Sequence, residues 1–96
     1  MKFLSKEADD GNVEYKLTLK EKSEDQKRLE ELASQMRFRL YEGTGEALYY
    51  LGVTDDGNPK GISEKELNES IASLQQIAEI AGAKLKILRK AQGNRR

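Results

Sequence analysis

The sequence predicts an α+β fold, a two-layer α/β sandwich with the element order β-α-β-β-α-β and both helices on one face of a four-stranded mixed sheet. Two observations lead to this prediction. Apolar residues alternate in several short stretches, as in strands, and recur every three to four residues in two longer stretches, as in helices. The 96 residues are enough for one domain. We place it at 12–90, between a flexible N-terminal tail at 1–11 and a basic C-terminal tail at 91–96.

The first strand is expected between Asn12 and Glu21, where the alternation is regular. One face is apolar and is predicted to point inward; it carries Val13, Tyr15, Leu17 and Leu19. The opposite face is polar and carries Glu14, Lys16, Thr18 and Lys20.

Two helices are predicted from capping boxes followed by apolar stripes. Ser23 and Gln26 begin the first, and Gly43 ends it. Its stripe consists of Leu29, Leu32, Ala33, Met36 and Leu40. Ser63 and Glu66 begin the second, and Gly82 ends it. The stripe of the second helix consists of Leu67, Ile71, Leu74, Ile77, Ala78 and Ala81.

The central strand is expected in the most apolar stretch of the chain, Glu46–Ile62. Its inward face is predicted to carry Ala47, Tyr49, Leu51 and Val53, and its other face Leu48, Tyr50 and Gly52. The turn Asp56-Gly57-Asn58 then reverses the chain because these residues tolerate a positive φ. Pro59 lacks an N–H group, so the return strand is expected to be short and at an edge.

The last strand is expected at Ala83–Lys90, with Ala83, Leu85 and Ile87 facing inward. We prefer the strand order 3-2-1-4, with strands 1 and 2 parallel through a right-handed crossover. A ferredoxin-like order, which would place strand 3 in the middle, is the alternative and is opposed by Pro59.

Composition excludes several classes of site. Lys plus Arg and Asp plus Glu both number 17, so a global basic field for nucleic acid is absent. The chain has no Cys and no His, which removes thiolate and imidazole metal sites, Cys nucleophiles and His-based triads. We therefore expect no enzyme activity, cofactor or metal. No apolar run reaches the roughly 20 residues of a membrane span, so a cytoplasmic protein without a membrane partner is expected.

Two local motifs are better explained by structure than by chemistry. Gly43-Thr44-Gly45 follows a helix and lacks the Lys and Ser/Thr of a phosphate loop, so it is interpreted as a helix stop. Asp55 and Asp56 are adjacent in a tight turn and point apart, whereas hard cations require converging oxygens.

One surface is a candidate for binding. The outer face of the predicted sheet would carry basic and polar residues around Leu48, Tyr50 and Leu88, namely Lys16, Thr18, Lys20, Lys84, Lys86 and Lys90. Lysines around an exposed ring can hold single-stranded nucleic acid through its phosphates and a stacked base. The same pattern also fits a solvated sheet face or a protein partner. In a further alternative, Phe3 and Leu4 fold back and cover the patch.

Three motifs carry a resemblance to a known family: D-G-N-V-E-Y-K-L at 10–17, Q-M-R-F-R-L-Y-E-G-T-G-E-A-L-Y at 35–49 and L-G-V-T-D-D-G at 51–57. Together with the following G-I-S-E-K-E-L, they resemble the N-terminal accessory domain of elongation-factor-like GTPases, the GTP-binding protein 1 family. They also resemble small uncharacterised archaeal proteins that carry this domain alone. The hairpin portion is similar to the divergent AlbA-like domain of Schlafen-type proteins.

The resemblance implies a role rather than a reaction. Those GTPases are linked to translation and RNA turnover, and their nucleotide chemistry resides in a separate domain. An accessory role near RNA or the ribosome, through Arg37, Arg39 and the G-x-G-E-A segment, is what the resemblance implies. The leading hypothesis is a non-enzymatic binding or adaptor domain associated with RNA or the translation machinery. The alternative is a protein–protein interaction or self-association module.

Overall fold

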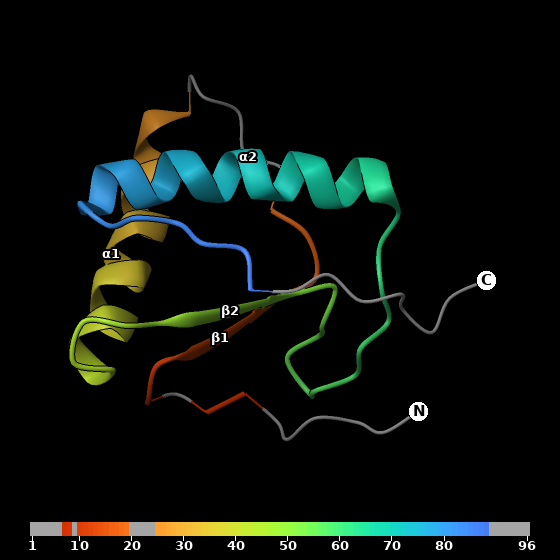
Figure 1. Cartoon of the computed structure of the whole chain (residues 1–96), viewed down its shortest axis with the longest axis horizontal. Helices are drawn as coiled ribbons and strands as arrows, with labels where there is room; N and C mark the ends of the chain where they lie inside the picture. Colours follow the sequence, from red (N-terminus) through yellow and green to blue (C-terminus); the bar gives the residue numbers. More distant parts are fainter. Residues whose placement is uncertain (1–6, 9, 20–24, 89–96) are drawn as a thin grey trace.

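The computed structural model describes residues 7–8, 10–19 and 25–88. Four elements follow one another along the chain (Figure 1): β1 at Val13–Lys16, α1 at Gln26–Glu42, β2 at Leu48–Leu51 and α2 at Glu64–Ala81. The α+β class and the two helices are therefore confirmed. The described residues form a two-stranded sheet, so neither the predicted four-stranded sheet nor its 3-2-1-4 order is confirmed.

The two strands pair in parallel, with Val13 opposite Leu48 and Lys16 opposite Leu51. This confirms the parallel arrangement predicted for the first two strands. A parallel pair cannot be joined by a tight turn, and α1 makes the connection.

The core lies between the two helices and the sheet. Its fully buried members are Leu19, Leu29, Leu32, Ala33, Met36, Leu74, Ile77 and Ala78. Tyr49 and Leu51 of β2 pack against this cluster, which confirms the facing predicted for the central strand. Each large side chain that is removed from water stabilises the fold by about 1.5–3 kcal/mol, so the two helical stripes hold the layers together.

The facing predicted for the first strand is wrong within β1. Residues that pair in a ladder point to the same face, and Glu14 pairs with Tyr49 while Tyr15 pairs with Tyr50. Glu14 and Lys16 therefore face the helices, and Tyr15 lies on the opposite face, with its ring 5.7 Å from that of Tyr50. A cationic partner on α1, Arg39, makes burial of Glu14 tolerable.

The alternation also fails beyond the end of β1. Leu17, predicted to point inward, is 41% exposed, whereas Leu19 enters the core. The Leu19 N–H donates to Ser70 Oγ of α2 at 2.9 Å. The strand ends at Lys16, so the two-residue period no longer applies and a contact with α2 positions Leu19 instead.

The ends of α2 are as predicted. Ser63 and Glu66 form the capping box, and Gly82 ends the helix in the left-handed conformation at φ 79°. The start of α1 differs from its prediction: the helix begins at Gln26, and the Asp25 side chain caps it by accepting from the Arg28 N–H. Ser23, the predicted N-cap, lies outside the described residues.

The predicted turn reverses the chain, but no return strand follows it among residues 58–63. Gly57 has a φ of +88°, as the turn requires, and its N–H donates to Thr54 O at 2.9 Å. Beyond the turn, the Gly61 N–H donates to Gly52 O at 2.9 Å. This bond holds the returning chain beside the end of β2, and Pro59 interrupts the run that a longer ladder would need.

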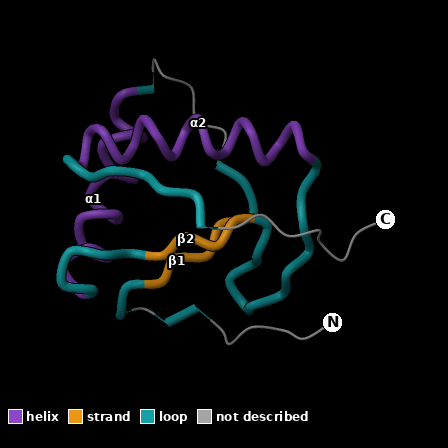
Figure 2. The backbone as a smooth tube through the Cα atoms, in the orientation of Figure 1, coloured by secondary structure: helices purple, strands orange, loops and turns teal. Residues whose placement is uncertain are grey.

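The predicted last strand is also absent from the described part of the chain, where 83–88 is drawn as loop (Figure 2). Ala83 and Leu85 are half-buried and pack against the core, as predicted. Ile87 was predicted to face inward and is 50% exposed. Lys90 and the basic tail lie outside the described residues.

Candidate binding surfaces

Arg39 is buried, and its side chain is bonded to the N-terminal segment, by which we mean residues 7–8 and 10–12. Its Nε donates to Glu14 Oε1 at 2.7 Å. Its two terminal nitrogens donate to three backbone carbonyls, those of Ala8, Asp10 and Gly11, at 2.8–3.0 Å. Such charge-assisted bonds are strong and directional. Arg39 therefore organises this part of the chain, and at 5% exposure it is buried rather than on the surface through which the resemblance implies a role near RNA.

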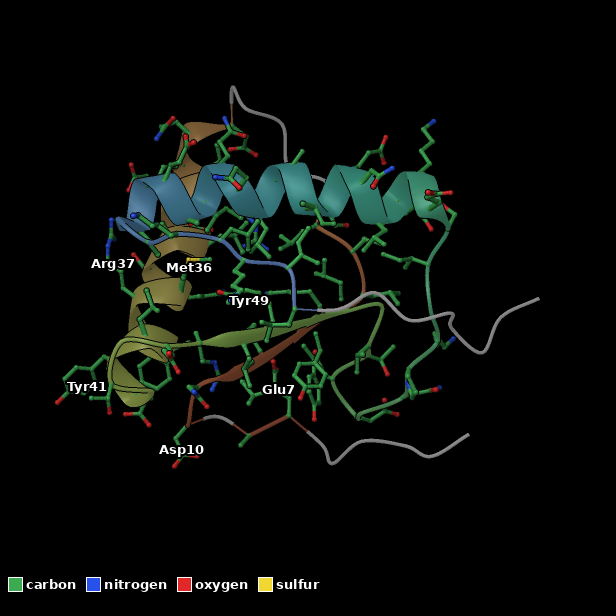
Figure 3. The ribbon with its side chains drawn as sticks, viewed as in Figure 1. Glu7, Asp10, Met36, Arg37, Tyr41 and Tyr49 are labelled. Carbon is green, nitrogen blue, oxygen red and sulfur yellow. The ribbon has the colours of Figure 1, made fainter. Side chains whose placement is uncertain are left out.

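The same contacts hold residues that the sequence assigned to a tail. Glu7 Oε2 accepts from the Tyr15 N–H at 2.6 Å, and the Glu7 N–H donates to Asp55 O at 2.8 Å. In Figure 3, Glu7 lies on the opposite side of the strands from Tyr49. Residues 1–6 and 9, which include Phe3 and Leu4, lie outside the described residues, so their predicted arrangement stays a prediction.

Half-buried Glu7, buried Glu14 and Tyr49 form an electrostatic cluster. Burial raises the pKa of the Tyr49 hydroxyl far above its ordinary value, and the Glu14 carboxylate adds to this effect. Burial also raises the pKa of Glu7, although the hydrogen bond from the Tyr15 N–H opposes it. A tyrosine that stays protonated and a carboxylate bound to Arg39 are suited to holding the fold rather than to transferring protons.

Lys16 does not lie on the outer sheet face where the sequence placed it. Its Nζ donates to Gln35 Oε1 of α1 at 3.2 Å and lies 3.4 Å from Glu14 Oε2. Because β1 presents its even-numbered residues to α1, Lys16 is separated from the face that carries Tyr50. Lys20, its predicted neighbour, lies outside the described residues.

A shallow hollow of about 400 Å³ lies between β1 and α1. Its lining consists of Glu14, Glu31, Ser34, Gln35, Phe38 and Arg39. The Arg39 guanidinium lies 5.6 Å from the centre of the Phe38 ring, and Glu14 is already bound to Arg39. Within the described residues no three Asp or Glu side chains converge as metal ligands.

The turn carboxylates have a structural role as well. Asp56 Oδ1 accepts from the Thr54 hydroxyl and from the Asn58 N–H. These two bonds, the hydroxyl first, lower the pKa of Asp56. The carboxylate thus stabilises the turn, as the sequence predicted, instead of facing a ligand with Asp55.

The sheet face away from the helices is exposed in part, because Tyr15 on it is buried whereas two apolar side chains of β2 are not. Leu48 is 37% and Tyr50 38% exposed on it, and the Tyr15 ring packs beside Tyr50. Lys84 and Lys86 are exposed, and they lie on segment 83–88 rather than on a strand. Tyr50 therefore has the accessible ring expected of it, without the lysine ladder of a complete sheet around it.

A second exposed feature lies at the end of α1. Arg37 Nη2 donates to the Ile80 carbonyl of α2 at 2.9 Å, so this residue joins the two helices. Tyr41 is 82% exposed and points away from the molecule (Figure 3). Sequence reasoning did not single out Tyr41, although its position off the apolar stripe of α1 was a signal for exposure. It also missed the Glu14–Arg39 pair, because the alternation assigned Glu14 to the polar face of the strand.

Comparison with known proteins gives a partial match. No protein-family model and no solved structure matches this chain. Human GTP-binding protein 2 is 46% identical over 90 residues, a match that covers 94% of this chain and 15% of that protein; the mouse protein has the same values. GTP-binding protein 1 of Xenopus laevis is 36% identical over 61 residues, or 64% of this chain and 9% of that protein. This chain resembles a segment of GTP-binding proteins 1 and 2.

The match confirms the expected resemblance to a GTPase accessory domain. The chain spans 15% of the length of GTP-binding protein 2, so most of that protein has no counterpart in it. A viral protein, uncharacterized protein R625 of Acanthamoeba polyphaga mimivirus, is 34% identical over 80 residues, or 82% of this chain and 42% of that protein. These relatives are eukaryotic and viral, and similarity to archaeal proteins stays a prediction. None of the described helices is long and apolar enough to cross a membrane.

Proposed function

We propose that this chain is a non-catalytic accessory domain that binds single-stranded RNA near the translation machinery. The observation that carries the proposal is the match of nearly the whole chain to a small part of GTP-binding protein 2. The chain contains no phosphate-loop sequence of the G-x-x-x-x-G-K-[ST] type. A segment of this kind contributes a binding surface to a larger GTPase instead of nucleotide chemistry.

Tyr50 supports RNA as the ligand. Its ring is exposed on a sheet face that no described helix covers, and the Tyr15 ring packs beside it. A base stacked on such a ring contributes about 1–3 kcal/mol without regard to sequence. Lys84 and Lys86, both exposed, supply ammonium groups for phosphates.

A protein partner is the second candidate, and the apolar content of the same face favours it. Leu48 and Tyr50 are exposed on this face, Leu17 just beyond β1 is exposed as well, and the formal net charge of the chain is zero. Exposed apolar patches often mark protein interfaces. In that case Tyr50 would dominate the affinity and the lysines at the rim would contribute little.

A titration of labelled oligouridylate at low and moderate salt separates the two candidates. For RNA, Tyr50→Ala should weaken binding about 5- to 150-fold with little change in salt slope. Lys84→Ala should reduce the salt slope by about 0.7, since one phosphate contact is lost. The matched control is Lys65→Ala, an exposed lysine at the start of α2. The proposal fails if the protein does not bind oligouridylate at low salt, or if Lys65→Ala weakens binding as much as Lys84→Ala.

A further inference from the structure

The outer edge of β2 has backbone groups that point away from β1. The Leu48 N–H donates to Asn12 O and the Gly52 N–H to Lys16 O, each at 2.8 Å. Alternate residues of a parallel strand bond to the same neighbour, so the N–H and C=O groups of Tyr49 and Leu51 are directed to the other edge. In the parts of the chain that the structure describes, these groups have no strand partner. Tyr49 and Leu51 are both half-buried, and buried backbone groups are almost always paired.

Residues 83–88 have the position and the sequence of the missing neighbour. They read A-K-L-K-I-L, with half-buried Ala83 and Leu85 alternating with exposed Lys84 and Lys86. Ala83 and Leu85 pack against the same core cluster as Tyr49 and Leu51. In Figure 1 the segment runs between α2 and β2, in the same direction as β2. A helix between β2 and this segment is the usual connection between neighbouring parallel strands.

We propose that residues 83–88 close onto the outer edge of β2 as a third parallel strand, and that this closure assembles the RNA-binding face. The strand pairing follows from the edge and the segment themselves. The ligand rests on the proposed function.

The facing of the side chains fixes which backbone groups make the bonds. Ala83 and Leu85 point to the core together with Tyr49 and Leu51, so they are their ladder partners. In a parallel ladder the residues on either side of a partner supply the bonds, so the N–H groups of Lys84 and Lys86 donate to β2. The N–H of Ile87 points to the new outer edge.

The same facing places the two lysines on the binding face. Their side chains project from the third strand on the side of the sheet that carries Leu48 and Tyr50. Two ammonium groups then flank an exposed ring, which is the combination that holds phosphates and a stacked base of single-stranded nucleic acid. The binding face thus keeps Lys84 and Lys86 of the predicted surface and lacks Lys16, which bonds to α1.

Three substitutions test the third strand, with amide hydrogen exchange of individual residues measured by NMR. Lys86→Pro removes a ladder N–H, whereas Lys86→Ala removes the charge alone and keeps the N–H. Ile87→Pro introduces the same ring where the N–H points away from β2, and it favours an extended Lys86. We expect the amides of Tyr49 and Leu51 to exchange about tenfold faster in Lys86→Pro than in the other two variants. Equal rates in all three variants would overturn the third strand.

Oligouridylate titration of the same variants tests the ligand. Ile87→Pro should bind like the unchanged chain, and Lys86→Pro should bind several-fold more weakly than Lys86→Ala, although both lack the lysine. Equal affinities of Lys86→Pro and Lys86→Ala overturn the coupling of closure to binding. If the exchange pattern holds and no variant binds oligouridylate, the third strand stands and the proposed function is refuted.

Discussion

The two helices both end at a glycine, and the two glycines are required for different reasons. Gly82 after α2 adopts φ 79°, and a Cβ built on it meets nothing within 4 Å. Gly43 after α1 has φ −97°, which any residue adopts, but a Cβ there would lie 1.8 Å from Glu46 O and 2.6 Å from Asn12 Cβ. Gly82 is required for a local backbone reason, and Gly43 because Glu46, three residues further on, and Asn12 of the N-terminal segment both approach it closely.

The same contrast extends along the helices. α2 is bounded by its own capping box and its own left-handed glycine. The C-terminal end of α1 is bonded to the N-terminal segment: the Gly11 N–H donates to Glu42 Oε1, and Arg39 donates to the carbonyls of Ala8, Asp10 and Gly11. Just beyond the helix, the Asn12 side chain donates to Glu46 O. Contacts within one helix are visible as sequence motifs, whereas contacts across some 30 residues are not.

The largest expected effect is at Arg39. Arg39→Met keeps much of the side-chain volume and leaves Glu14 buried without its main partner, which should reduce the free energy of unfolding by at least about 3 kcal/mol. The control is Arg37→Met, which loses one bond, to Ile80 O, at an exposed position and should cost less than about 1.5 kcal/mol. Urea titrations measure both.

A double variant separates the charge from the packing at this position. If the cost of Arg39→Met arises from the uncompensated Glu14 carboxylate, Glu14→Leu should restore part of the stability in the Arg39→Met background. No recovery would mean that the bonds from Arg39 to Ala8, Asp10 and Gly11 carry the effect instead. Similar losses in the Arg39 and Arg37 variants would show that the bonds of Arg39 to Glu14 and the N-terminal segment are no more important than the single bond of Arg37 to α2.

The second prediction concerns Gly43. The Cβ added by Gly43→Ala pushes the Glu46 backbone and the Asn12 side chain away from residue 43. This displacement also disturbs the neighbouring sheet bond from the Leu48 N–H to Asn12 O. Overpacking of this kind should cost about 2–3 kcal/mol in a denaturant titration. A loss under about 0.5 kcal/mol would show that Glu46 and Asn12 are not held close to the end of α1.

Sequence reasoning predicted the features that depend on neighbouring residues and missed those that depend on contacts between residues far apart in the sequence. The stripe of α1, the part of the α2 stripe at Leu74, Ile77 and Ala78, the capping box at Ser63 and the positive φ of Gly57 follow from spacing and residue type, and all are present. The facing of β1 was wrong because alternation alone assigns the apolar side inward. A buried Glu14 depends on Arg39, 25 residues away, which no periodicity reveals.

The candidate surface was predicted only in part, for the same reason. Tyr50 is exposed beside Tyr15, as a strand residue facing away from the helices should be. Lys16 was assigned to that surface by alternation, and Gln35 of α1 bonds it on the other face. Strand order depends on which strand edges pair through their backbone groups, such as those of Tyr49 and Leu51. Backbone groups are the same in almost every residue, so residue types along the sequence do not show which edges pair.

The third prediction concerns Gly82, the counterpart of Gly43. Gly82→Ala meets no atom, so the cost is the left-handed conformation of a residue with a Cβ, about 1 kcal/mol. Urea titration of this variant beside Gly43→Ala tests the comparison directly. A greater loss at Gly82 than at Gly43 would reverse the assignment of local and distant causes.

The smallest expected effect is a pH dependence at Glu7, in the segment that Arg39 holds. Burial raises the pKa of Glu7 above its ordinary value of 4.5, so the folded state binds the proton more tightly than the unfolded state does. The contribution of Glu7 to stability is therefore largest below pH 4.5 and is lost as the pH rises through the folded-state pKa. Glu7→Gln keeps an oxygen for the Tyr15 N–H and removes this titration. The free energy of unfolding of the unchanged chain, measured relative to Glu7→Gln, should fall from pH 4 to pH 7. A rise over that range would show that Arg39, whose nearest nitrogen lies 3.9 Å from Glu7 Oε2, outweighs burial at this carboxylate.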